Sequence, residues 1–117
     1  MQYMLLIYED ESVFGDEKNS PLLEEIVQRH QAFAAELAAE GVIRGGEGLK
    51  GTDSATTVRT AGGAQTVHDG PFAETREQLG GFYLIDVPDL DAALAVARRL
   101  PIAKDGSVEV RPVLGGG

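Results

Sequence analysis

The chain of 117 residues has the length of one domain and the composition of a globular protein. Hydrophobic residues make up 43% of it, yet no apolar run approaches the ~20 residues that cross a membrane. Cysteine is absent, which excludes disulfides, thiolate metal sites and a cysteine nucleophile. The formal net charge of −9 opposes binding to a phosphate backbone. We therefore expect a cytoplasmic protein with no membrane partner and no direct nucleic-acid partner.

The N-terminal third predicts a buried strand followed by a helix. Residues 2–8 are apolar at both odd and even positions, which is typical of a strand covered on both faces. After an irregular acidic stretch, Ser20 is placed as the N-cap of a helix over 21–40. Gly41 is placed to end that helix. Its apolar stripe contains one polar residue, His30.

The middle of the chain predicts short extended segments. Glycine-rich residues 42–51 read as a short strand that runs into a bend. Residues 55–60 and 65–68 form a predicted hairpin, because the Gly62-Gly63 pair suits the positive φ angles of a tight turn. Residues 81–87 are again largely apolar, and they predict a second buried strand.

The C-terminal third predicts a helix and a last strand. Asp89 caps a helix whose Leu90, Ala93, Leu94 and Ala97 are expected to point inward. Residues 107–113 then alternate apolar and charged, as a strand with one wet face does. We expect a single domain over 1–114 and a flexible glycine tail at 115–117.

The order β-α-β-(hairpin)-β-α-β predicts an α+β, ferredoxin-like protomer. Right-handed crossovers place both helices on one face of its sheet. The strands at 2–8 and 81–87 are apolar on the other face as well, and no further helix is predicted to cover it. We expect a homodimer that closes sheet against sheet through this face.

Two motif-like stretches do not predict a cofactor or metal site. Residues 46–51 spell GxGxxG, but extended structure is expected after them instead of the helix that a dinucleotide fold requires, so a plain turn is favoured. The acids within 9–17 match no cation-binding loop in their spacing, and a solvated loop is favoured there. We expect no cofactor and no metal.

His30 is the first candidate for chemistry. Its position on the apolar stripe directs the imidazole toward the sheet, where a polar ring needs a partner. A core histidine bonded to a backbone carbonyl is one explanation. A carboxylate is the other, because the hairpin register places Asp69 on the Val67 side of the ribbon and His68 on the opposite, more polar side. Asp69 can equally cap the turn that follows it.

Residues 69–82 resemble the signature of the DGPF (DGPFAETKE) branch of the YCII-related proteins, with Arg76 at the position where lysine is usual. The resemblance spans nearly the whole chain. It also includes His30 and Phe33, the Gly46-Glu47-Gly48-Leu49 segment, and residues 55–59, 83–87 and 107–112.

This resemblance implies a ferredoxin-like protomer that pairs into a dimeric α/β barrel. It also implies a pocket in which His30 and Asp69 act as a catalytic pair. Distant relatives of the barrel act on lactones as isomerases or dehalogenases. Some DGPF proteins are encoded beside alternative sigma factors, which implies an accessory regulatory role. The net charge of −9 indicates that such a role works through protein partners rather than DNA.

Two functions therefore stay open: a small-molecule enzyme that uses the His30–Asp69 pair, and a noncatalytic ligand-binding or regulatory module. For the enzyme, proton abstraction beside a carbonyl is the first reaction to test, since neutral-pH proton transfer suits imidazole. Arg44 or Arg59 would hold a small anionic or cyclic ligand. Phe72 is expected to bury its ring and anchor an ordered loop beside the pocket.

Overall fold

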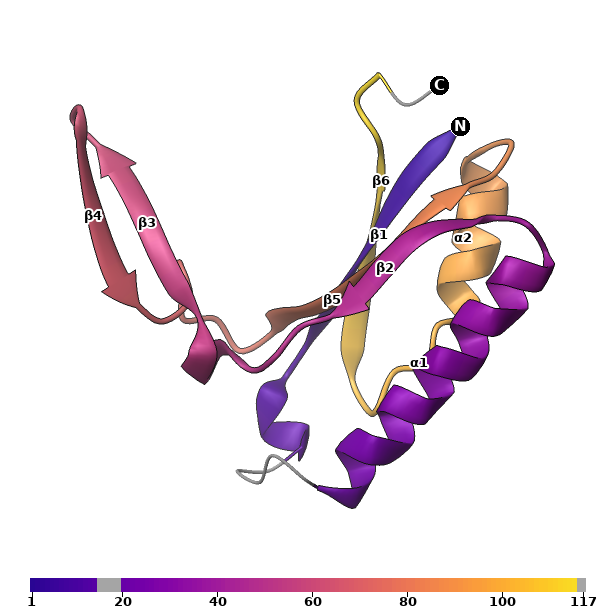
Figure 1. Ribbon diagram of the computed structural model, residues 1–117, viewed down its shortest axis with the longest axis horizontal. Coiled ribbons are helices and arrows are strands. Elements are labelled where there is room, and N and C mark those ends of the chain that lie inside the picture. Colours follow the sequence, from indigo (N-terminus) through magenta and orange to yellow (C-terminus); the bar gives the residue numbers. More distant parts are fainter. Residues whose placement is uncertain (15–19, 116–117) are drawn as a thin grey trace.

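The structure is a computed structural model, and it describes residues 1–14 and 20–115. A four-stranded antiparallel sheet in the order β2-β5-β1-β6 and a separate two-stranded sheet, β3-β4, make up its β-structure (Figure 1). The elements in chain order are β1 (Gln2–Glu9), α1 (Pro21–Ala39), β2 (Ile43–Gly48), β3 (Thr56–Ala61), β4 (Ala64–Asp69), β5 (Gln78–Asp86), α2 (Leu90–Arg99) and β6 (Gly106–Pro112). The predicted ferredoxin-like α+β fold is confirmed, with β3-β4 as the inserted hairpin.

Both helices cover one face of the four-stranded sheet. Tyr3, Leu5 and Ile7 of β1 are buried on this face, and Leu5 pairs with Tyr83 of β5. The same buried cluster includes Phe33 and Leu37 of α1 and Ala93 and Val96 of α2. The odd-numbered residues of both central strands therefore form the core, and both helices lie on one face of the sheet, as the right-handed crossovers predict.

The even-numbered residues of the central strands lie on the opposite face, which neither helix covers. Met4 pairs with Leu84 and Leu6 pairs with Phe82 across β1 and β5. All four side chains are partly exposed. We call this surface the open face. Its apolar composition explains why the two strands read as buried on both sides.

The helix ends follow the predicted caps. The Ser20 hydroxyl accepts from the Leu23 backbone N–H at 3.0 Å, and Asp89 accepts from Ala92 N–H at 2.9 Å. One detail of α2 was wrong: Leu90 is 50% exposed, because the buried stripe runs instead through Ala93 and Val96. Within the described residues, no helix has the length and apolar composition needed to cross a bilayer.

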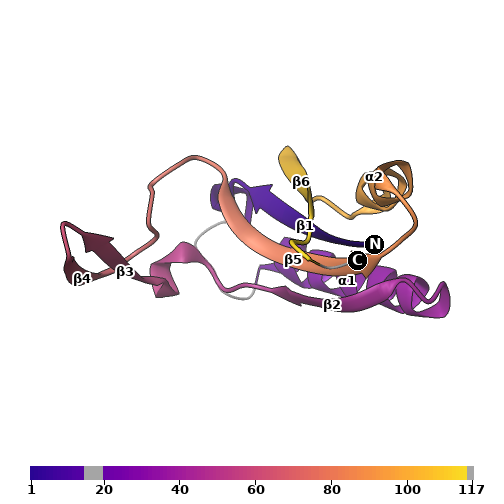
Figure 2. The same cartoon turned by 90° about the horizontal axis from the view of Figure 1, so that it is seen from above.

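The β3-β4 hairpin projects from the body of the protein as an arm, as Figures 1 and 2 show from two directions. Its turn contains Gly62 and Gly63 at φ of 58° and 79°, and the predicted register is confirmed, with Val58 opposite Val67. These two valines are 59% and 67% exposed. The arm therefore presents apolar surface on which a second chain could pack. Such packing would stabilise a two-stranded hairpin, which is at best marginally stable when isolated.

We predict that the protein is a homodimer closed through the open face. Light scattering at micromolar concentration should give twice the 12.4 kDa mass of the chain. Leu6→Glu places a charge at the centre of the open face and should yield monomers. Leu90→Glu adds the same charge on exposed helix surface and should leave the dimer intact. A wild-type monomer would contradict the prediction.

Candidate functional site

A cavity of about 790 Å³ lies on the helix side of the sheet, between the N-terminal half of α1 and the ends of β1, β2 and β5. Apolar residues of α1 form one wall, among them Ile26, Val27 and Ala34. Glycines of the facing strands line another part: Gly46, Gly48, Gly80 and Gly81. Because these strand positions carry no side chains, the helical stripe is not fully packed there, and space remains for a small molecule.

Gly46 also determines how closely β2 approaches the tyrosine in the cavity. A Cβ at this position would lie 2.9 Å from the Phe82 carbonyl oxygen and 3.1 Å from Cδ1 of Tyr83. Contacts this short would force the strands or the ring to move. A side chain here would therefore separate β2 from β5 or displace Tyr83 from its place beside His30.

His30 and Tyr83 form the polar centre of the cavity. Nδ1 of His30 lies 2.7 Å from the Tyr83 hydroxyl, and the two rings are stacked with their centroids 5.8 Å apart. Phe33 contacts Tyr83 edge to face at a centroid distance of 5.6 Å. The partner that His30 requires is thus a tyrosine hydroxyl, instead of the backbone carbonyl or carboxylate that the sequence suggested.

The single proton of the Tyr83 hydroxyl links the two possible imidazole tautomers to two chemical roles. If the hydroxyl donates to Nδ1, His30 carries its proton on Nε2 and acts as a donor there. If the hydroxyl instead donates to the His30 carbonyl oxygen, 3.4 Å away, it accepts from Nδ1–H and leaves Nε2 as a free base. A small shift of the tyrosine proton therefore changes Nε2 of His30 from a hydrogen-bond donor to a proton acceptor.

Burial keeps both rings neutral near pH 7. Desolvation lowers the pKa of His30 below its usual 6.5, and the nearby Arg29 guanidinium lowers it further. Desolvation also raises the pKa of Tyr83 to about 12. The imidazole is consequently a neutral base and the phenol a neutral donor over the physiological range.

Glu9 brings a carboxyl group to the same cavity. It continues the row of Tyr3, Leu5 and Ile7 at the end of β1, on the helix side of the sheet. Burial raises its pKa above the usual 4.5, against the lowering effect of a hydrogen bond from the Ala103 backbone. This acid was predicted only as part of a solvated loop, yet it occupies the site.

Asp69 does not meet His30 within one chain. It pairs with Thr56 at the base of the arm, in the separate two-stranded sheet, and it is exposed. The residues that line the cavity do not include it. The structure therefore brings His30 together with Tyr83 and Glu9, while it holds Asp69 on the arm.

The loop after Asp69 is ordered by the polar face of the arm. Thr57 Oγ1 donates to the Gly70 carbonyl at 2.7 Å, and Arg59 Nη2 donates to the Phe72 carbonyl at 2.9 Å. His68 Nε2 lies 3.4 Å from the Pro71 carbonyl oxygen on the same side. The predicted burial of Phe72 was wrong, since its ring is 75% exposed. Side-chain hydrogen bonds to backbone carbonyls hold the loop instead of an apolar anchor.

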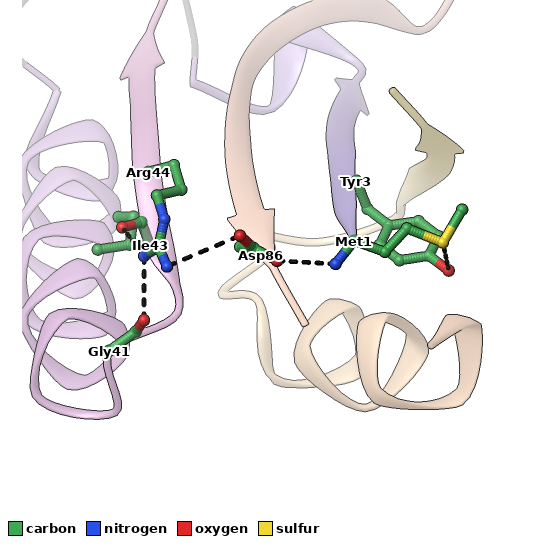
Figure 3. Close-up of polar contacts among 6 residues, drawn as sticks. All are labelled: Met1, Tyr3, Gly41, Ile43, Arg44 and Asp86. Carbon is green, nitrogen blue, oxygen red and sulfur yellow. Dashed lines mark hydrogen bonds and ion pairs between the residues drawn. The ribbon is translucent and has the colours of Figure 1, made fainter. Parts of the chain in front are cut away.

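Neither predicted anion-binding arginine lines the cavity. Arg44 folds back on its own segment, where Nη1 donates to the Gly41 and Ile43 carbonyls at 3.0 Å each (Figure 3). Its Nη2 lies 3.8 Å from Asp86, whose carboxylate also accepts from the Met1 amine at 2.8 Å. Arg59 is occupied on the arm, as described above. Both side chains support local structure within this chain.

The two motif-like stretches have structural roles. Gly46 and Gly48 lie within strand β2, so the stretch predicted as a plain turn is in fact extended as far as Gly48. Glu11 accepts from Thr52 N–H at 2.8 Å and from Thr52 Oγ1 at 2.7 Å, which ties a 3₁₀ turn after β1 to the segment after β2. Asp16 and Glu17 of the acidic stretch lie outside the described residues.

Sequence reasoning missed Tyr83 and Glu9. A signal for Tyr83 was present, because it occupies the odd-numbered row of a core strand, where a buried phenol needs a hydrogen-bond partner. His30 was the polar residue on the facing helix stripe. Glu9 carried a similar signal, since it lies two residues after Ile7 in the same strand and so points to the same face of the sheet.

We predict that His30 titrates below pH 6.5, because the folded protein desolvates its charged form. The unfolded chain then binds the proton more tightly, so stability is fully present above pH 6.5 and is lost as the pH falls through the folded pKa. NMR titration of the two histidines, assigned with His30→Asn, measures the pKa. A His30 pKa at or above 6.5 would contradict the prediction.

Tyr83→Phe should cost about 1 kcal/mol of unfolding free energy, since it removes one side-chain hydrogen bond.

The chain is similar to known proteins over nearly its full length. Residues 1–115 match the YCII-related domain. An uncharacterised protein of Rhizobium meliloti (strain 1021) is 44% identical over 120 residues, which cover 97% of this chain and 92% of the relative. Both similarities include the helix that carries His30 and the strand that carries Tyr83. The chain therefore belongs to the YCII-related family.

Proposed function

We propose that the protein is a small-molecule enzyme in which His30 transfers a proton to or from a bound substrate. The observation that supports this best is the neutral imidazole in the cavity, held at Nδ1 by the Tyr83 hydroxyl at 2.7 Å. A base that is partly desolvated and fixed in orientation needs no metal or cofactor to abstract a proton. A histidine that served packing alone would not need a cavity beside it.

The reaction class is proton abstraction beside a carbonyl. His30 Nε2 takes a proton from the carbon next to the carbonyl, and the electron pair of the broken C–H bond moves to the carbonyl oxygen as an enolate. Return of the proton at another carbon completes an isomerisation. Tyr83 orients the imidazole by its hydrogen bond and so acts as a positioning residue.

Asp69 enters this proposal through the second chain of the dimer. The arm holds Asp69 away from the cavity of its own chain, so a His30–Asp69 pair would form between protomers. The exposed Val58 and Val67 supply apolar surface for packing the arm on a partner. A carboxylate delivered this way would favour the protonated imidazole after abstraction.

We predict that the protein exchanges C–H for deuterium beside the carbonyl of small lactones or cyclic ketones. NMR in D₂O measures the exchange across a panel of such compounds. His30→Asn should slow it by roughly 10²–10⁴-fold, the usual contribution of a general base. His68→Asn removes the other, exposed histidine and should have little effect. Absence of exchange throughout the panel would favour a noncatalytic ligand-binding module.

Mixing two inactive variants tests whether Asp69 acts between chains. Co-expressed His30→Asn and Asp69→Asn chains should recover roughly a quarter of wild-type activity, since half the dimers are mixed and each mixed dimer has one intact site. A pair within one chain would leave every site defective. No recovery would therefore remove Asp69 from the proposal, while His30 keeps its own test.

A further inference from the structure

Glu9 is the one carboxyl group of the described cavity that combines partial burial with an unpartnered oxygen. Its Oε1 is buried and has no hydrogen-bond partner among the described residues. Its Oε2 lies 3.5 Å from the point where a Cβ on Gly80 would sit, and Gly80 itself lines the cavity. The Ala103 backbone offsets only part of the cost of burying this carboxyl group, whose pKa is still raised, so the ionised carboxylate gains from a donor that a ligand brings.

The net negative charge of the cavity lining also favours a ligand that donates hydrogen bonds. Among the described residues that line it, four are acids and one is a lysine: Glu9, Glu11, Glu47, Asp53 and Lys50. Glu11 already accepts two hydrogen bonds from Thr52. Neither Arg44 nor Arg59 contributes to the lining, so an anionic ligand would meet net repulsion there.

We propose that Glu9 is the specificity-determining residue of this cavity and binds a hydrogen-bond-donating group, best an amine, of a ligand with an apolar body. This deepens the proposed function, on which it rests for the use of the His30 cavity. The ammonium group would pair with the Glu9 carboxylate, while the apolar wall from α1 would contact the rest of the molecule. The same charges disfavour a carboxylate ligand.

Three probes of equal ring size test the ligand class: benzylamine, benzyl alcohol and benzoate. Two-dimensional NMR of the full chain should show saturable shifts of the cavity glycines with benzylamine, weaker shifts with benzyl alcohol, and none with benzoate at the same concentrations. Glu9→Gln should weaken benzylamine about tenfold, because a charge-assisted hydrogen bond becomes a neutral one. Glu25→Gln removes one exposed acid of α1 outside the lining, and it should change binding less than twofold.

The pH dependence gives a second readout. Benzylamine binding should strengthen as the pH rises through the pKa of Glu9, because only the ionised carboxylate pairs with the ammonium group. The other titratable groups that line the cavity are His30, Tyr83, Glu11, Glu47, Lys50 and Asp53. Glu9→Gln should remove this dependence, whereas Glu25→Gln should keep it.

A stability measurement shows whether the Glu9 variant folds. Since burial raises the pKa of Glu9 above 4.5, the wild-type protein loses stability as the pH rises through that pKa. Glu9→Gln should therefore unfold at a higher denaturant concentration than wild type at pH 7.

Benzoate that binds as well as benzylamine, an unchanged benzylamine affinity in Glu9→Gln, or no shift at the cavity glycines would each overturn the assignment. None of these results bears on proton transfer by His30, which deuterium exchange with His30→Asn measures separately. Likewise, an absence of deuterium exchange would not contradict benzylamine binding by Glu9.

Discussion

The pairing of β1 with β5 is the constraint on which the rest of the structure depends. Both strands are apolar on both faces, so the sheet they form needs cover on two sides. The two helices supply it on one side only, where Leu5, Leu37 and Ile85 are completely buried. The apolar surface that remains on the open face is the basis for the predicted homodimer.

The cavity arises where that core ends. Toward Glu9 the strand pairing shifts register after Ile7, and glycines replace side chains on β5 and β2. The helix continues past this point with its apolar stripe intact, so Ile26 and Val27 line a space in place of packed strand side chains. The fold thus leaves its core incomplete at the place where the partly buried His30 meets Tyr83.

Two ionisable groups of the cavity, His30 and Glu9, reduce the stability of the fold, as is typical of groups placed for binding or catalysis. Desolvation moves the pKa of His30 down and that of Glu9 up, so each group is held in an environment that disfavours its charged form. A protein selected for stability alone would fill such a space with aliphatic side chains. Retaining two desolvated ionisable groups beside an open cavity is the pattern expected of a binding or catalytic site.

The sequence by itself determined the element order, the helix caps, the hairpin register and the core positions on α1, because these depend on local spacing and on side chains within a few residues of each other. It also indicated His30, through its place on an apolar stripe. Long-range contacts were beyond its reach: strand parity at the core, Tyr83 as the partner of His30, and Glu9 in the cavity. These features, together with the exposed Phe72 and the remote Asp69, depend on how the sheet register and the direction of the arm place segments distant in the chain, and only the tertiary structure decides that.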